Sequence, residues 1–263
     1  VMIGEAYLPI DRLMAYYGAD LTGFHLPFNF HLISTDWTPR AVASLIEVYE
    51  AALPPGAWPN WVLGNHDRSR VASRVGPAQA RVAAMLLLTL RGTPTIYQGE
   101  EIGMMDTPIP PHLVQDPFER NVPGLGLGRD PVRTPMPWSP ERHGGFTKGR
   151  PWLPLNPDAE ALNVSAQASD PQSMLSLYRA LIRLIRDNDV LLVGNLRLLA
   201  ATDNVLAYER RLGGVRVVVA LNMTAQALSL RVENPDYETL LSTYLDEPGA
   251  LKEGLPQTLW CLA

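Results

Sequence analysis

The stretch Trp58-Pro59-Asn60-Trp61-Val62-Leu63-Gly64-Asn65-His66-Asp67 decides the fold, because a short apolar run ends in a cluster of polar residues. The run 58–63 is typical of a buried strand, and Gly64 and Asn65 mark its end. In parallel sheets, reactive side chains gather where the strands end. Asn65, His66 and Asp67 are therefore candidate functional residues.

The sequence around this stretch alternates between strand and helix patterns. Thr38 and Pro39 form a typical helix start, with Thr as the cap and Pro in the first turn. Strands are expected at 1–6, 23–30, 58–63 and 93–98, and helices at 11–17, 38–53 and 78–90. Short joints between strands and helices indicate βαβ units and a parallel sheet. Polar residues follow each strand, at Glu5, Asn29, 65–67 and 100–101.

The second half of the chain differs from the first in composition and in its secondary-structure pattern. Residues 103–170 are rich in Pro, Gly and short polar stretches, and we expect a functional loop region there. An amphipathic helix is expected at 174–186, followed by strands at 194–199, 205–210, 215–221 and 227–232 and two weaker ones. Gly213-Gly214 is typical of a hairpin turn. These patterns predict a small antiparallel all-β domain.

The number of units predicts half of a TIM-type (β/α)8 barrel. A complete barrel takes about 250 residues before additions, whereas the chain of 263 residues must also contain the loop region and the β domain. Only four strand–helix units fit. The expected fold class is α/β, with a half barrel at 1–188 and a β-sandwich-like domain at 189–263.

Composition excludes several classes of function. Apolar residues make up 46% and charged residues 19% of the chain, and its net charge is −5. This balance favours a folded core and argues against nucleic acid or an anionic membrane as partner. The single cysteine, Cys261, fits a reducing cytoplasm best, although it is also compatible with export. No apolar segment reaches the length of a membrane span, and no leader pattern is present.

Four ordered stretches resemble the second half of the α-amylase family of glycoside hydrolases. They are Gly4-Glu5, Asn65-His66-Asp67, the run Gln98-Gly99-Glu100-Glu101-Ile102-Gly103-Met104, and Arg129-Asp130-Pro131-Val132-Arg133-Thr134-Pro135-Met136. The last two resemble the α-glucosidase and oligo-1,6-glucosidase branch. The resemblance covers essentially the whole chain and implies retaining hydrolysis of α-linked gluco-oligosaccharides, without a cofactor or metal.

The resemblance also implies roles for individual residues. Glu5 would be the general acid/base, and Asp67 would stabilise the oxocarbenium-like transition state. His66, Asn65, Arg133 and Tyr7 would bind substrate. Each of these residues also has a structural interpretation. Asn-His-Asp is a good turn sequence, Arg133 could anchor its loop to Asp130 or Asp116, and Tyr7 could serve as packing. Glu100 and Glu101 are interpreted as structural anchors.

The family nucleophile is expected to be absent. It is an aspartate at the end of the fourth barrel strand, whereas this chain opens on Val1-Met2-Ile3-Gly4, which reads as the middle of the fifth. The half barrel would also leave strand edges at 1–6 and 93–98. A separate N-terminal half, a second copy or a rearranged sheet could cover these edges. The competing functions are a non-catalytic α-glucan-binding remnant and an inverting or rerouted hydrolase.

Overall fold

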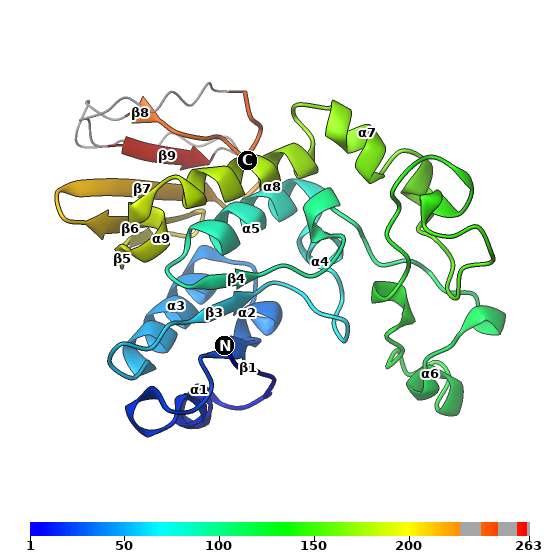
Figure 1. Cartoon of the computed structure of the whole chain (residues 1–263), viewed down its shortest axis with the longest axis horizontal. Coiled ribbons are helices and arrows are strands. Elements are labelled where there is room, and N and C mark those ends of the chain that lie inside the picture. The colour runs from blue at the N-terminus through cyan, green and yellow to red at the C-terminus, as the bar shows by residue number, and fades with distance from the viewer. Residues whose placement is uncertain (227–237, 247–256, 262–263) are drawn as a thin grey trace. The chain divides into compact units, whose positions relative to one another are not determined.

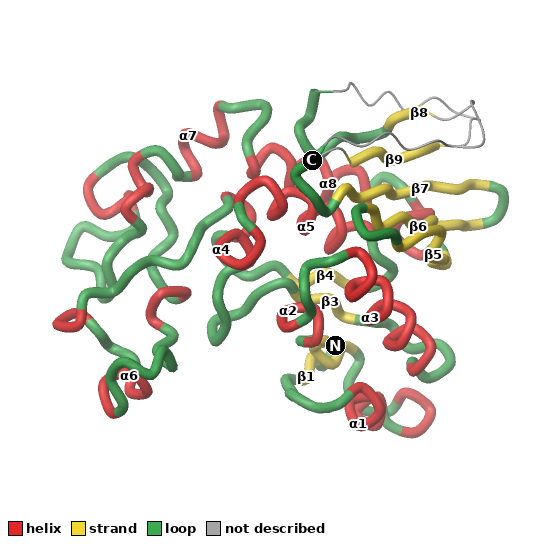
Figure 2. The backbone as a smooth tube through the Cα atoms, turned by 180° about the vertical axis from the view of Figure 1, so that it is seen from behind, coloured by secondary structure: helices red, strands yellow, loops and turns green. Residues whose placement is uncertain are grey.

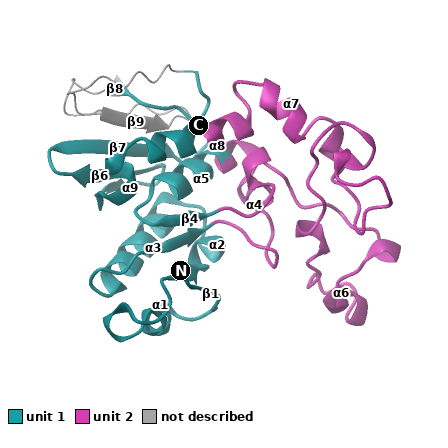
Figure 3. Ribbon diagram, in the orientation of Figure 1, with its two compact units in different colours: residues 1–62, 81–95, 180–263 teal, residues 63–80, 96–179 magenta. Residues whose placement is uncertain are grey.

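The computed structural model describes residues 1–226, 238–246 and 257–261, which form two compact units (Figure 3). The first unit contains residues 1–62, 81–95 and 180–263, and the second contains 63–80 and 96–179. The strand expected at 227–232 lies outside the described residues. The boundary expected after residue 188 stays a prediction.

The first unit contains the parallel sheet. Its strands are β1 (Ile3–Gly4), β2 (Leu26–Asn29), β3 (Asn60–Val62) and β4 (Thr93–Thr95), in the order β1-β2-β3-β4. Every neighbouring pair is parallel, with Ile3 opposite Leu26, Phe28 opposite Asn60 and Asn60 opposite Thr93. The strands are shorter than the apolar runs that predict them, but the half-barrel expectation is confirmed.

Three helices connect strands β1, β2 and β3 of this sheet along the chain. They are α1 (Ile10–Met14), α2 (His31–Ser34) and α3 (Pro39–Ala52), with 3-10 turns at Ala15–Tyr17 and Ala19–Leu21. The Thr38 hydroxyl accepts a hydrogen bond from the Ala41 amide at 3.3 Å, which confirms the predicted cap. Helix α3 lies alongside β3 (Figure 2), where the rings of Tyr49 and Trp61 are 5.3 Å apart.

Helix α5 (Pro77–Thr89) is apolar on all sides from Val82 to Leu88, and all its residues from Val82 to Thr89 are buried. A helix of this kind requires protein on every side. Its last residue, Thr89, pairs through its hydroxyl with Tyr208, and its carbonyl accepts from the buried Arg210 guanidinium at 2.8 Å. Arg210 also donates to the Gly194 carbonyl at 2.9 Å. Burial lowers the pKa of Arg210 to about 10.

A second sheet follows α9 (Asp189–Val193) in the first unit (Figure 1). It contains β5 (Asn195–Ala201), β6 (Val205–Leu212), β7 (Val215–Asn222), β8 (Glu238–Thr239) and β9 (Gln257–Cys261). Strands β5, β6 and β7 are antiparallel, as expected, and the predicted Gly213-Gly214 turn joins Leu212 to Val215. Strand β9 pairs in parallel with both β7 and β8, which the sequence pattern does not predict.

The second unit has little regular structure. Its helices are α4 (Val71–Val75), α6 (Pro117–Asn121), α7 (Val164–Ser169) and the start of α8 (Met174–Arg186). Short 3-10 turns occupy Glu100–Ile102, Pro111–Leu113, Asp130–Val132, Arg142–Gly145 and Pro157–Glu160. A small apolar cluster joins Ile102, Met104, Met136 and Leu175. Within the described ranges, no helix is long and apolar enough to cross a membrane.

Candidate active site

The turn after β3 presents Asp67. The buried Asn65 accepts a hydrogen bond from the Asp67 amide through its Oδ1 at 3.0 Å. This side-chain-to-backbone bond closes an Asx turn, the structural role considered for Asn-His-Asp. The turn fixes the backbone of Asp67 directly after a buried strand, while the Asp67 side chain remains 26% exposed. A dissolved ligand can therefore reach the carboxylate.

Three cationic or polar groups contact one oxygen of Asp67. Its Oδ1 lies 2.9 Å from Nη2 of Arg133, 3.2 Å from Nη1 of Arg129 and 3.3 Å from Nε2 of His66. Arg133 also donates through Nε to the His66 carbonyl at 2.9 Å. The other oxygen, Oδ2, accepts no hydrogen bond from any residue that the structure describes. The site thus holds a carboxylate by one oxygen and leaves the second available.

Asp116 lies on the far side of Arg129 and is buried. Its Oδ2 accepts from Nε of Arg129 at 2.8 Å and its Oδ1 from Nη2 at 3.0 Å, so the pair is bidentate. The Arg129 hydrogen bonds hold the pKa of Asp116 well below its usual range, and Asp116 in turn raises the pKa of Arg129. The sequence motifs do not predict this contact between Arg129 and Asp67.

Arg133 does not form the loop-anchoring ion pair with Asp130 or Asp116 that was considered for it. Arg133 pairs with Asp67, whereas the partner of Asp116 is Arg129. Asp130 accepts instead from two backbone amides, those of Gln115 at 2.6 Å and Asp116 at 2.9 Å. Both amides bind Oδ2 of Asp130, so Asp130 anchors the backbone of its loop rather than the Arg133 side chain.

Arg70 joins three loops beneath the site. Its buried guanidinium donates to the Gln98 carbonyl at 2.6 Å and to the Val132 carbonyl at 2.8 Å. Its backbone amide donates to Asp106 at 2.7 Å. Burial lowers the pKa of Arg70. These contacts give Arg70 a structural role, because they tie the loop after β3 to the loop after β4 and to the 129–136 segment.

Glu100 is a buried carboxyl beside the same turn. Its Oε2 accepts from the Tyr97 amide at 3.2 Å, while its Oε1 has no hydrogen-bond partner in the described part of the chain. A Cβ atom at Gly64 would come within 2.5 Å of that Oε1. Burial raises the pKa of Glu100 to about 8. The neighbouring Glu101 accepts from the Gly99 amide at 2.7 Å, as an anchor does.

Glu5 and Tyr7 belong to the first unit, after β1. Glu5 is exposed and directly follows the strand. The Tyr7 ring is half exposed and stacks on Phe30 with ring centres 4.3 Å apart, and Phe30 stacks in turn on Phe28. Tyr7 therefore makes the packing contact considered for it and also keeps an open face. The acid/base role of Glu5 and the substrate-binding role of Tyr7 stay predictions.

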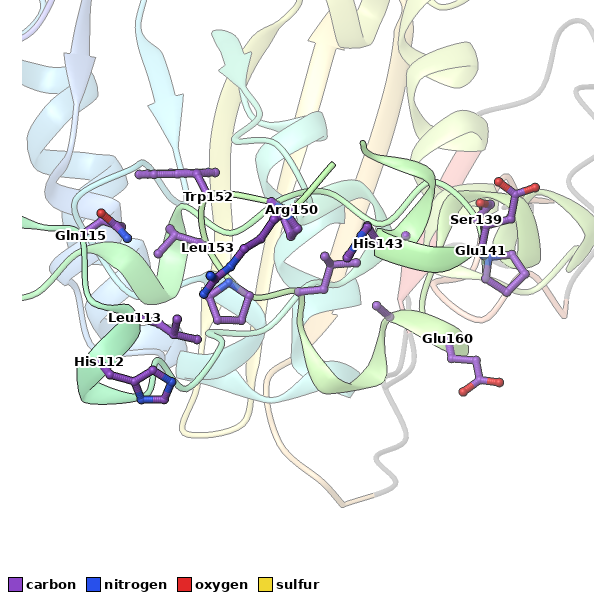
Figure 4. Close-up of a pocket in the computed structure, with 16 residues that line it drawn as sticks. His112, Leu113, Gln115, Ser139, Glu141, His143, Arg150, Trp152, Leu153 and Glu160 are labelled. Atoms are coloured by element: carbon purple, nitrogen blue, oxygen red, sulfur yellow. Dashed lines mark hydrogen bonds between the residues drawn. The ribbon is translucent and has the colours of Figure 1, made fainter. Parts of the chain in front are cut away.

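A separate cavity of about 900 Å³ lies within the second unit (Figure 4). His112, Arg150 and Trp152 line one part of it, and His143 and Glu141 line another. It shares no lining residue with the group around Asp67. Across the described ranges, no cluster of three or more His, Cys, Asp or Glu side chains could hold a metal ion.

Comparison with known proteins identifies the family of the chain. The family model of the α-amylase catalytic domain matches residues 1–194. A salivary α-glucosidase of Anopheles gambiae is 37% identical over 88% of this chain and 40% of its own length. An oligo-1,6-glucosidase of Parageobacillus thermoglucosidasius is 32% identical over 82% of this chain and 44% of its own length.

The crystal structure of an α-glucosyl transfer enzyme superposes with a TM-score of 0.85 at 31% identity. The match covers 96% of this chain and 48% of that enzyme. The chain thus spans less than half the length of the relatives it matches. The family model, these relatives and the half-barrel sheet together place the chain in the α-amylase family of glycoside hydrolases, in the α-glucosidase and oligo-1,6-glucosidase branch.

Proposed function

We propose that the chain acts on α-linked gluco-oligosaccharides by a retaining mechanism, with Glu5 as general acid/base and Asp67 as transition-state stabiliser. The observation that carries the proposal is the state of Asp67, whose Oδ1 contacts Arg133 and Arg129 while Oδ2 has no partner among the described residues. A carboxylate held in this way can accept hydrogen bonds from vicinal sugar hydroxyls without losing its orientation.

The chemistry follows from where charge develops. An oxocarbenium-like transition state carries positive charge at the anomeric carbon, and a fixed carboxylate nearby stabilises that charge more than it stabilises the neutral sugar. Arg133 and His66 would donate to sugar hydroxyls on the same side, since both already contact Asp67. Asn65 would act by holding the turn, and the open face of Tyr7 would contact a sugar ring.

The nucleophile is a further part of the proposal. Retaining glycosidases place two carboxyl groups about 5–5.5 Å apart, and no aspartate in the sequence matches the family nucleophile motif. We infer that a separate N-terminal half supplies it, whereas a second copy, having the same sequence, would cover the open strand edge without bringing this aspartate. The exposed edge strand β1, with Ile3 54% exposed, supports pairing with another chain. A monomer in sedimentation equilibrium at working concentration would contradict self-association.

Hydrolysis of an aryl α-glucoside tests the proposal. Glu5→Gln should lower turnover by about a hundredfold or more, the scale of one general acid/base group. Asp67→Asn should lower kcat more than it raises KM, because Asp67 acts mainly on the transition state. Retention requires that the first-formed glucose is the α-anomer by NMR. Full activity of Glu5→Gln would refute the acid/base assignment, and a β-anomer would indicate an inverting or rerouted hydrolase.

Calorimetry separates the enzyme from a non-catalytic α-glucan-binding remnant. A remnant should bind maltose oligosaccharides and release no glucose from them. An enzyme should bind them and turn them over, alone or with a separately supplied N-terminal half. Failure of both binding and turnover would reject both functions.

A further inference from the structure

We propose that Asp116 and Arg129 are positioning residues for Asp67, because buried Asp116 fixes the fork of Arg129 and one remaining nitrogen of that fork holds Asp67 Oδ1. This inference rests on the proposed role of Asp67 in binding α-glucosides. It assigns no contact with substrate to either Asp116 or Arg129.

Asp116 is itself rigidly held. Its amide donates to the buried Asp130 carboxylate at 2.9 Å, and its Oδ1 accepts from the Phe118 amide at 3.1 Å as the cap of helix α6. Its Oδ2 also accepts from the Arg129 amide at 2.7 Å. Backbone amides therefore hold the Asp116 carboxylate in place independently of its contacts with the Arg129 side chain.

The Arg129 fork transmits that fixed position. Nε and Nη2 both bind the Asp116 carboxylate, and the guanidinium lies 4.8 Å from the Phe118 ring centre. A planar guanidinium held at two nitrogens has no freedom to rotate. Its third nitrogen, Nη1, must then point in one direction, and Asp67 Oδ1 lies there at 3.2 Å.

The consequence for Asp67 is a defined orientation. With Arg129 and Arg133 both on Oδ1, rotation of the carboxylate would break two charge-assisted bonds at once. Oδ2 is therefore kept available for a ligand. Among the described residues, Arg133 donates to the His66 carbonyl and to Asp67 alone, so the fixed reference comes from Asp116 through Arg129.

Binding of 1-deoxynojirimycin, a glucose-shaped imino sugar with a protonated ring nitrogen, tests the inference on the full chain without requiring turnover. We expect Asp116→Asn to weaken binding by about tenfold, as for one hydrogen bond to a charged group. Asp67→Asn should weaken it more, and the double variant should bind no more weakly than Asp67→Asn alone. Additive losses in this double-mutant cycle would overturn the inference.

Two further variants separate positioning from charge and from fold. Arg129→Lys keeps the charge but loses the fork, so it should weaken binding as much as Asp116→Asn does. Wild-type affinity in Arg129→Lys would overturn the inference. Glu119→Gln is the matched control on helix α6, where Glu119 accepts from the Gly124 and Gly128 amides and from no other residue in the described part of the chain. Its affinity should stay at the wild-type value, and a loss equal to that of Asp116→Asn would count against a specific role.

A crystal structure of Asp116→Asn gives a result that does not depend on any ligand. We expect the Arg129 guanidinium to turn away from Asp67 and the Asp67 carboxylate to rotate. An unchanged Arg129–Asp67 contact would overturn the positioning role. If wild-type protein fails to bind the imino sugar but Asp116→Asn shows the rotation, the proposed function fails while the positioning link stands.

Discussion

The two compact units are stabilised in different ways. The first unit has regular strands and helices around apolar residues such as Ile46, Trp61 and Leu86. The second unit is mostly loop, and buried ionisable side chains hold those loops together, among them Arg70, Asp116 and Glu100. Apolar burial is non-directional and tolerates adjustment, whereas buried polar groups need each partner in place. The second unit should therefore be the more sensitive to single polar substitutions.

Arg70→Ala should have the largest effect. It would leave the Gln98 and Val132 carbonyls without their donor, and each orphaned buried group costs about 1–3 kcal/mol. We expect a loss of about 4 kcal/mol in the free energy of unfolding of the second unit. Hydrogen exchange should rise in residues 63–80 and 96–136 and stay low in β6 and β7. Arg179→Ala, an exposed control, should change neither region.

Leu86→Ala is the corresponding test of the first unit. Leu86 is fully buried in α5, and such truncations cost about 2–5 kcal/mol through lost burial and the cavity left behind. We expect about 3 kcal/mol by urea denaturation, with faster hydrogen exchange in the first unit. Val48→Ala, on the exposed side of α3, should cost far less. Equal losses would mean that apolar burial does not dominate this unit.

Glu100→Gln should reveal a pH dependence in the second unit. The folded-state pKa of Glu100 is raised to about 8 by burial, so the native state keeps a proton that the unfolded chain releases near its ordinary value. Wild-type stability from this group is complete below about pH 4.5 and is lost as pH rises toward about 8. A glutamine side chain at position 100 does not titrate, so its contribution to stability does not change with pH.

The variant should therefore gain stability relative to wild type as pH rises. Between pH of about 5 and about 7, we expect a relative gain of about 2.5 kcal/mol, measured by urea denaturation at both pH values. Glu160→Gln, at an exposed position, is the control. Parallel pH curves for wild type and Glu100→Gln would contradict a protonated buried carboxyl.

Arg40→Ala should have the smallest effect. Arg40 pairs with Asp203 at 2.8 Å, but the two side chains are 67% and 82% exposed. Water screens such a pair, and exposed ion pairs contribute about 0.2–1 kcal/mol or nothing measurable. We expect a change below about 0.5 kcal/mol in urea denaturation. A loss of stability as large as that of Arg70→Ala would show that the exposed Arg40 contributes as much as the buried Arg70, contrary to this expectation.

Sequence patterns predict the first unit better than the second. The Thr38–Pro39 helix start, the buried run at 82–89 and the Gly213-Gly214 turn are all formed as expected. These features arise from local periodicity and turn chemistry, which act between residues close in sequence. The runs at 58–63 and 93–98 overestimate β3 and β4, because apolar residues continue past the last ladder hydrogen bond.

The candidate site could be anticipated only in part. Asn65, His66, Asp67 and Arg133 are recognisable from motifs, and the structure brings Asp67, His66 and Arg133 into contact. The sequence does not predict the Asp116–Arg129 pair. An aspartate before Pro117 is typical of a helix cap, and that pattern does not reveal whether the aspartate also binds an arginine. Glu100 reads as an anchor, and its burial beside Gly64 depends on how two loops pack.

The amino-acid sequence is sufficient for the identity of the Asn65-His66-Asp67 turn after a buried strand, and for family membership. Spacing and residue type carry that information because strand ends and turns are local. Arg129 and Arg133 hold one oxygen of Asp67 and leave the other available. These two arginines lie 62 and 66 positions from Asp67 in the chain. Folding sets those contacts through long-range packing and buried charge, which local patterns do not encode.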